Sequence, residues 1–465
     1  MKTSQSVFFD IKYFFPSVKD GFDIVIANPP YIKEYTNRAA FEGLRESEYY
    51  QGKMDIWYMF SAVGLDLLKE GGVECFIAQN NWVTSSGASK MRNKIISETQ
   101  VLALVDFGNY KIFETAGIQT MIMLFKKKAT TSYKIDYRRL LGDDALPLDV
   151  VDLLQRNHSD KTEYLEPVVE SDEMYDKKMT FSNSEAEAIL KKIHSRTDFK
   201  LDAKAEVAQG IVYPQDRVNK ASKEVLGASF QIGDGIFVLS NEEKDRLPLG
   251  EKEMELIKPC YSTNELQRWN GDSKNCEWVI YTDSGFREEQ RLYEYPTIKK
   301  HLDQFKAVIT SDNKPYGLHR ARDERFFNGT KIIGLRKCAY PTFTYTDFDC
   351  YVSATFYVIK SERINQLYLT GLLNSRLIAF WLKNKGKMQG SNYQIDKEPL
   401  IDLPLVAGTP DEQKKMGAVV EKIIGLLKIN PDADVKDLET EIDETVFDLY
   451  GLTEEEKIVI RGANL

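Results

Sequence analysis

Apolar and polar residues follow two different periods in the first 128 residues. A short apolar run at residues 22–27 lies between Gly21 and two prolines, which predicts a buried strand that ends at Asn28. Residues 54–68 carry apolar side chains at helical spacing, and short apolar runs then return. After the first strand we expect a helix at 54–68, a strand at 73–78, a helix at 85–98, and strands at 101–107 and 119–126.

Two consecutive prolines fix the backbone after the predicted first strand. Each proline pushes the residue before it out of helical space, so Asn28 and Pro29 are held extended. Open α/β sheets bind their ligands at the carboxyl ends of strands. The side-chain oxygen of Asn28 and the main-chain oxygen of Pro29 are two acceptors for one amino group, and Tyr31 adds a flat ring. Asn28, Pro29, Pro30 and Tyr31 thus form a candidate catalytic site for a planar amine.

The amine of a purine is a weak nucleophile because its lone pair is delocalised into the ring. When both of its protons are bound by acceptors, the nitrogen becomes pyramidal and its lone pair can attack an activated methyl group. This chemistry needs no charged base. The alternative interpretation is a turn that ends a strand and happens to contain two prolines.

Further motifs follow the Asn-Pro-Pro-Tyr tetrapeptide: Gly-Lys-Met-Asp-Ile-Trp at residues 52–57, Gly71-Gly72, Asn-Asn-Trp at residues 80–82, and the segment 107–120. In this order they resemble the amino-methyltransferases that act on DNA, particularly the adenine methyltransferases of the Taq type and of type IIG restriction-modification enzymes. The resemblance implies that the tetrapeptide binds the amine and that Tyr31 stacks on the base. It also implies that Phe113 stacks on the other face of a flipped adenine. Packing in the core of a hairpin is the alternative for Phe113.

The predicted elements are similar to the second half of a Rossmann-like class I methyltransferase sheet, whose last two strands are antiparallel. Such a sheet holds S-adenosylmethionine with a glycine-rich turn after its first strand. Residues 1–21 contain no Gly-x-Gly and are too few for three strand–helix units. We therefore expect the main S-adenosylmethionine-binding elements outside this chain, in a second polypeptide or an upstream segment, and no activity without them. The strand at residues 22–27 should then have one unpaired edge and one uncovered apolar face.

Residues 286–340 reverse the charge of the chain. The chain of 465 residues has a net charge of -9, but this segment carries twelve lysines and arginines against seven acidic residues. Aromatic residues lie between these cations, which is typical of surfaces that anchor phosphates and read base edges. A solvated charged face is the alternative. We expect contacts with double-stranded DNA from Lys306, Lys314, His319, Arg320, Arg322, Arg325, Arg336 and Lys337.

Four segments at residues 205–211, 331–333, 368–375 and 403–405 resemble parts of the target-recognition domain of the same family. Residues 431–460 are acidic and have a helical apolar pattern. We expect an α/β protein with four parts: a partial methyltransferase domain at residues 1–128, a connecting region at 129–180, an α+β DNA target-recognition domain at 181–430, and a helical C-terminal segment at 431–465.

The resemblance implies a site-specific DNA adenine-N6 methyltransferase of the type IIG restriction-modification kind, which transfers a methyl group from S-adenosylmethionine to a flipped adenine. Two alternatives are a DNA-binding specificity subunit without catalysis of its own, and an RNA or protein amine methyltransferase. No apolar stretch reaches the length of a membrane span, and the five cysteines form no C-x-x-C pair. We therefore expect a cytoplasmic protein with free thiols, no membrane contact and no metal site.

Overall fold

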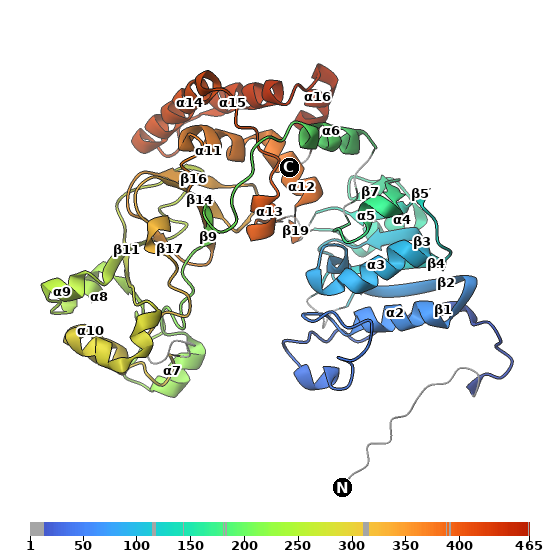
Figure 1. The fold of residues 1–465 in the computed structure, drawn as a ribbon, viewed down its shortest axis with the longest axis horizontal. Helices are drawn as coiled ribbons and strands as arrows, with labels where there is room; N and C mark the ends of the chain where they lie inside the picture. The colour runs from blue at the N-terminus through green and yellow to red at the C-terminus, as the bar shows by residue number, and fades with distance from the viewer. Residues whose placement is uncertain are drawn as a thin grey trace, which may run out of the picture. The chain divides into compact units, whose positions relative to one another are not determined.

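The computed structural model describes residues 14–113, 118–142, 144–179, 181, 184–309, 316–386, 388–389, 392–463 and 465. The chain divides into two compact units, Met1–Ile189 and Leu190–Leu465 (Figure 1). Each unit has its own sheets and its own buried apolar core. Each unit therefore holds together through contacts of its own.

A six-stranded sheet organises the described residues of the first unit. Its strands are β1 (Phe22–Ala27), β2 (Leu68–Gln79), β3 (Thr99–Asp106), β4 (Thr120–Lys127), β6 (Asp136–Leu140) and β7 (Thr162–Leu165). Their order across the sheet is β1-β2-β4-β3-β6-β7 (Figure 1). β1 is parallel to β2, and β4 is antiparallel to both β2 and β3. The carboxyl ends of β1, β2 and β3 therefore meet at one edge, and the expected antiparallel pair is confirmed.

Helices cover this sheet through side chains that alternate between its two faces. α2 (Trp57–Leu67) and α3 (Ser89–Glu98) pack on the face that carries Phe76, whereas α4 (Pro147–Gln155) packs on the face that carries Ile77. Other elements are the 3-10 helix η1 (Arg38–Phe41), β5 (Ser132–Lys134), β8 (Val168–Glu170), α5 (Ser171–Met174) and α6 (Ser184–Ser195), which crosses into the second unit.

The expected elements of residues 22–127 are present, but the strand at residues 22–27 is not the buried strand that we expected, because none of its residues is buried and Ile24 and Ile26 are exposed. A second difference is the position where α2 ends. The helix ends at Leu67 and β2 begins at Leu68, so Gly71 and Gly72 lie in the strand. The register between β1 and β2 shifts at this point, and Gly71 has a φ of 81°. Gly71 therefore allows a local irregularity in β2 and does not end α2.

β1 lies at the edge of the sheet, and its outer side has no strand partner among the described residues. Ile26 pairs with Cys75, on the face opposite the one where Phe76 meets α2. On that face Ile24 and Ile26 are 66% and 75% exposed. Burying an isoleucine is worth about 1.5–3 kcal/mol, so this pair is costly to leave in water. Within the part of the chain that the structure describes, β1 therefore has one edge without a strand partner and one apolar face that is exposed.

The region expected to connect two domains, residues 129–180, contributes β6 and β7 to the same sheet. β6 is parallel to β3, and β7 is antiparallel to β6. The pattern of apolar residues did not predict these strands, because charged side chains form pairs between them. Arg139 lies opposite Glu163 and donates to its carboxylate at 2.5 Å.

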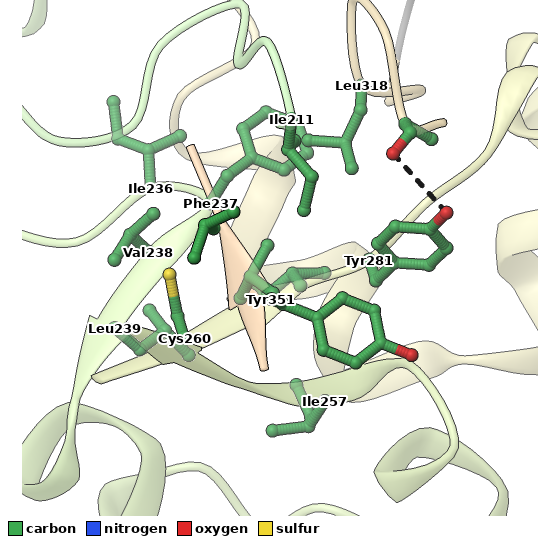
Figure 2. Packing of buried hydrophobic residues seen from close by; sticks show 14 of the residues in the cluster. Ile211, Ile236, Phe237, Val238, Leu239, Ile257, Cys260, Tyr281, Leu318 and Tyr351 are labelled. Carbon is green, nitrogen blue, oxygen red and sulfur yellow. Dashed lines mark hydrogen bonds between the residues drawn. The ribbon is translucent and has the colours of Figure 1, made fainter. Parts of the chain in front are cut away.

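The second unit contains several smaller sheets, and a large apolar cluster packs between two of them. Its strands are β9 (Val207–Gln209), β10 (Val238–Ser240), β11 (Ile257–Tyr261), β12 (Trp269–Asn270), β13 (Glu277–Ile280), β14 (Lys331–Leu335), β15 (Lys337–Cys338), β16 (Phe343–Thr346), β17 (Tyr351–Val352), β18 (Phe356–Ile359), β19 (Met388–Gln389) and β20 (Asn392–Gln394). The sheet orders in the described residues are β10-β13-β11-β17, β12-β16-β14-β18-β9 and β15-β20-β19. Figure 2 shows Phe237, Leu239 and Tyr351 packed together in the core that the first two sheets share.

Helices complete the second unit. They are α7 (Lys220–Leu226), α8 (Asn241–Arg246), α9 (Glu251–Met254), α10 (Pro296–Asp303), α11 (Gln366–Asn374), α12 (Arg376–Lys385), α13 (Lys397–Ile401), α14 (Pro410–Ile429), α15 (Lys436–Leu449) and α16 (Glu454–Gly462). α14 packs along α11, and α15 packs on α14 and α12 (Figure 1). The expected helical C-terminal segment is confirmed, and the fold as a whole is α/β.

Candidate active site and nucleic-acid interface

Asn28 and Tyr31 follow β1 at the sheet edge where β1, β2 and β3 end. The hydroxyl of Tyr31 donates to Oδ1 of Asn28 at 2.8 Å and also lies 2.9 Å from the carbonyl oxygen of Ile77 in β2. Asn28 and Pro30 are exposed, whereas Pro29 is buried. Tyr31 therefore ties the loop to the sheet and holds the side chain of Asn28.

Burial and the nearby carboxylate of Asp55 raise the pKa of Tyr31 to about 12. The hydroxyl is therefore protonated at neutral pH and can act as a hydrogen-bond donor. An uncharged ring beside Asn28 is also suited to stacking on a flat, neutral partner.

Asp55 holds the segment that follows Tyr31. Its Oδ1 accepts the N–H of Ile32 at 3.0 Å, and the N–H of Ile56 donates to the carbonyl of Ile32 at 2.9 Å. Oδ2 of Asp55 is buried without a partner among the described residues. Burial raises the pKa of Asp55, although the N–H groups that it accepts oppose this. Asp55 was not expected as a site residue, but the motif at residues 52–57 contained the signal.

The segment at residues 32–50 is anchored rather than free. The carboxylate of Glu34 accepts the hydroxyl of Tyr50 at 2.5 Å and the N–H of Lys53 at 2.7 Å. Further along, η1 buries Phe41 in the core of the unit. The segment at residues 32–50 thus contains a short 3-10 helix, and hydrogen bonds to Glu34 fix its flanks.

Phe113 lies in the connection between β3 and β4, which leaves the same sheet edge as Tyr31. Its side chain is half-buried and belongs to none of the buried apolar clusters of the described residues. Residues 114–117 lie outside the described part of the chain. The topology brings the two aromatic residues to one edge, and the stacking role of Phe113 stays a prediction.

A polar network supports this edge from β3. Oδ1 of Asp106 accepts Nδ2 of Asn80 at 2.9 Å and the N–H of Gly108 at 3.0 Å, and Oδ2 accepts the hydroxyl of Tyr137 at 3.2 Å. Burial, followed by the charge of Asp106, raises the pKa of Tyr137. The network fixes the starts of the loops after β2 and β3, and Asn80 belongs to the Asn-Asn-Trp motif.

The sheet edge that carries Asn28 and Tyr31 lies beside the outermost strand of the sheet, β1. Beyond β1, where the donor-binding strands of a class I sheet would continue, the described residues add no strand. The exposed side chains of Ile24 and Ile26 occupy the face that further elements would cover.

Three of the eight expected DNA contacts, Lys306, Arg325 and Arg336, form ion pairs, and one lies outside the described residues. Lys314 is that one. Nζ of Lys306 lies 3.4 Å from the carboxylate of Glu289, and Nε of Arg325 lies 3.0 Å from that of Asp323. These two ion pairs are exposed, where such pairs are worth only about 0–1 kcal/mol, so DNA phosphates could compete for these cations.

Arg320 and Arg322 lie close together on a strained turn. Arg322 has a φ of 78°, a left-handed conformation that a long side chain rarely adopts. It donates to the carbonyl of Gly210 at 3.3 Å and to the side-chain oxygen of Gln209 at 3.0 Å. Burial, followed by the charge of Arg320, lowers the pKa of Arg322. Arg320 itself is exposed.

Arg336 and Lys337 lie next to each other at the start of β15, and Lys337 is exposed. Arg336 forms an ion pair with Asp396 at 2.6 Å. Tyr357 is close to both partners: burial and Asp396 raise its pKa, and Arg336 opposes this. His319 is half-buried. The structure thus groups part of the expected basic surface around Tyr357.

Arg376, outside the basic segment 286–340, has a structural role. The guanidinium of Arg376 donates to the carbonyl oxygens of Ile460, Arg461 and Ala463 at 3.1, 2.7 and 2.9 Å. Its N–H donates to Asp443 at 2.7 Å. This arginine anchors the C-terminal helices to α12.

The strand order with an antiparallel β4, and an Asn-Pro-Pro-Tyr loop at the carboxyl end of β1, define a sheet of the class I methyltransferase kind. Residues 2–113 match the Eco57I restriction-modification methylase family, and residues 287–405 match the TaqI-like C-terminal specificity domain. One segment of the chain is thus similar to restriction-modification methylases, and a second segment is similar to a specificity domain.

Individual relatives support this assignment. The type II methyltransferase M.HindII of Haemophilus influenzae is 20% identical over 413 residues, which cover 83% of this chain and 75% of that protein. The adenine-specific methyltransferase BrxX of Escherichia coli is 23% identical over 125 residues, 26% of this chain and 10% of that protein. The type IIL restriction-modification enzyme MmeI, solved in complex with DNA, has a TM-score of 0.64 at 11% identity, over 94% of this chain and 56% of that chain. The chain thus spans about half the length of MmeI.

Within the described residues, no helix is both long and apolar enough to cross a membrane. The same residues contain no cluster of histidine, cysteine, aspartate or glutamate side chains that could hold a metal ion.

Proposed function

We propose that this chain carries the amine-activating and DNA-recognising parts of a site-specific adenine-N6 DNA methyltransferase. The observation that carries the proposal is the Asn28–Tyr31 pair at the carboxyl end of β1, in a chain that also has a specificity domain. The methyl group would come from S-adenosylmethionine.

Asn28 and Pro29 would bind the exocyclic amine of a flipped adenine. The Tyr31 hydroxyl occupies one lone pair of Asn28 Oδ1, and a carbonyl oxygen has a second one for an amine proton. The carbonyl of Pro29 would take the other proton, and the two acceptors would stabilise the positive charge that develops on nitrogen. Tyr31 and Phe113 would stack on the two faces of the base and replace the stacking lost on flipping.

The methyl-donor elements would come from residues outside the described part, in a second polypeptide or another segment. The unpaired edge of β1 and the exposed Ile24 and Ile26 support this. A sheet edge of this kind is a ready template for another strand, and the two isoleucines would be buried by a covering helix. The same observation favours a second candidate, a specificity subunit that binds DNA without catalysis of its own.

Duplex DNA is the preferred substrate over RNA or a protein amide. The specificity domain covers residues 287–405, which contain most of the basic surface. The solved enzyme with a similar fold, MmeI, was seen in complex with DNA.

The test is methylation of duplex DNA by the purified chain with labelled S-adenosylmethionine, followed by mass spectrometry of the nucleosides. We expect sequence-dependent DNA binding by the chain alone, and N6-methyladenine only when a donor-binding part is added. Asn28→Ala should abolish the product without loss of DNA affinity. N4-methylcytosine as the product would refute the adenine assignment. Full activity of the chain alone would refute the external donor site, and modification of RNA or protein in place of DNA would refute the substrate class.

A further inference from the structure

Arg336 and Asp396 meet where two distant segments of the second unit pair. Arg336 precedes β15 and Asp396 follows β20, and these strands are antiparallel neighbours. Nε of Arg336 donates to Oδ1 of Asp396 at 2.6 Å. The main chain of Arg336 is also fixed: its N–H donates to the carbonyl of Thr355 at 2.9 Å, and its carbonyl accepts the N–H of Ile395 at 2.7 Å. The main chain and Nε of Arg336 are therefore both held in place.

The carboxylate of Asp396 is held at both of its oxygens. Nε2 of Gln394 donates to Oδ2 at 2.8 Å, while Arg336 occupies Oδ1. Asp396 is also the N-cap residue of α13, but its side chain makes no capping hydrogen bond. An aspartate at this position commonly accepts an N–H of the helix. Here the carboxylate is turned toward Arg336 and Gln394 instead, so it orients the guanidinium of Arg336.

The outer end of Arg336 is open. Among the described residues, neither Nη atom has a hydrogen-bond partner, and the side chain is 39% exposed. A guanidinium that is held through Nε keeps its terminal nitrogens as a planar pair of donors. Such a pair matches the O6 and N7 acceptors of guanine in the major groove, and the bidentate contact discriminates against other bases.

The neighbouring cations differ from Arg336 in this respect. The guanidinium of Arg322 donates hydrogen bonds to Gly210 and Gln209, and the guanidinium of Arg325 donates to the carbonyl of Ala205. Lys337 is exposed, but an ammonium is a point charge that suits a phosphate better than a base edge.

We propose that Arg336 reads a guanine of the target sequence, with Asp396 and Gln394 as its positioning residues. The inference rests on the proposed function, since it requires that the second unit bind duplex DNA. It deepens that function by naming one base of the target and the residue that specifies it.

The test is selection of bound duplexes from a randomised DNA library by the full chain, which needs no methyl donor. We expect the parent chain to select a sequence with a guanine that Arg336→Lys no longer requires, while the other selected positions persist. Arg336→Lys keeps the charge, so its affinity for unrelated DNA should stay unchanged while affinity for the selected sequence falls about 10- to 100-fold. Asp396→Asn should weaken the same guanine preference by a smaller factor. The matched control is Lys337→Ala, which should lower affinity for all sequences alike and reduce the salt dependence.

A chemical change in the DNA provides a second readout. Replacing the selected guanine by 7-deazaguanine removes the N7 acceptor, which should weaken the parent chain but leave Arg336→Lys unaffected. Selection of the same guanine by the parent and by Arg336→Lys, with both folded by circular dichroism, would overturn the inference and leave DNA recognition intact. A parent chain that binds DNA without any sequence preference, or not at all, would overturn both this inference and the proposed function.

Discussion

The hydroxyl of Tyr31 lies 2.8 Å from the side-chain oxygen of Asn28. The same hydroxyl lies 2.9 Å from the carbonyl oxygen of Ile77, so one proton serves two acceptors on different parts of the sheet edge. Tyr31 thereby has two separable parts: a ring that can face a base, and a hydroxyl that orients Asn28. Either part can be removed without the other.

Tyr31→Phe should keep the ring and lose the orientation of Asn28. We expect kcat for DNA methylation to fall about 3- to 10-fold with little change in KM for DNA, because a lost hydrogen bond costs roughly 0.5–1.5 kcal/mol. Steady-state kinetics with the donor-binding part present gives both constants. Tyr31→Ala is the comparison, since it should also weaken binding of the flipped base. Equal effects of the two substitutions would contradict a separate role for the hydroxyl.

Asp55→Ala should loosen the segment after Tyr31. The main-chain N–H of Ile32 would lose its acceptor, and we expect a loss of about 1–3 kcal/mol in the stability of the first unit. Thermal unfolding followed by tryptophan fluorescence measures this loss. Asp55→Asn keeps an oxygen in place of Oδ1 and should retain most of the stability. If both variants melted with the parent chain, the hydrogen bond to Ile32 would be unimportant.

The raised pKa of Glu74 should make the stability of the first unit depend on pH. Glu74 lies fully buried in β2, where burial raises its pKa from 4.5 to about 8, although a hydrogen bond from Ser61 opposes this. Between these two pH values the folded carboxyl keeps a proton that the unfolded chain releases, so stability falls as pH rises. The decline should approach roughly 1.4 kcal/mol per pH unit within that window and level off above pH 8.

Glu74→Gln is the matched variant for this pH dependence. It keeps the shape of the neutral side chain, so its unfolding free energy should change less between pH 5 and 8 than that of the parent chain. Denaturant unfolding at several pH values measures the difference. Parallel pH profiles of parent and variant would show that Glu74 is not the titrating group. Ala would be a poor replacement at Glu74, because it would leave a cavity beneath α2.

Arg376→Ala should destabilise the second unit without weakening DNA binding directly. Its guanidinium satisfies three carbonyl groups near the end of α16, and its loss should cost roughly 2 kcal/mol or more. Differential scanning fluorimetry and a DNA-binding assay well below the melting temperature separate the two effects. Lys337→Ala should show the opposite pattern, with weaker binding and unchanged melting. Reduced DNA affinity of a fully folded Arg376→Ala would place this arginine at the duplex.

The apolar pattern predicted the helices and strands of residues 22–127 because most of them bury apolar side chains; β1, whose residues are all at least partly exposed, is the exception. It did not predict β6 and β7, where pairs such as Arg139 and Glu163 replace apolar contacts across the strands. The Asn-Pro-Pro-Tyr loop was predictable because prolines act locally on the backbone. The contact of Tyr31 with Ile77 was not, since only the pairing of β1 with β2 brings them together.

The basic surface was predicted from charge alone, which could not rank its members. Arg376 and Arg336 look alike in the sequence. In the structure the guanidinium of Arg376 donates to backbone carbonyls, whereas Nε of Arg336 donates to Asp396 and its two terminal nitrogens have no partner among the described residues. The partner of Arg336 lies sixty residues away, so no local spacing marks the pair. Orientation of a side chain is a property of the folded chain.

Because the edge of β1 is unpaired within the described residues, the stability of the first unit should depend on the concentration of any partner that binds there. Whatever covers Ile24 and Ile26 binds the folded state and not the unfolded one, so by mass action it adds stability in proportion to the logarithm of its own concentration. Without that cover, the same edge favours self-association of the chain as it becomes more concentrated. The melting temperature of the first unit would therefore report any partner that binds to this edge.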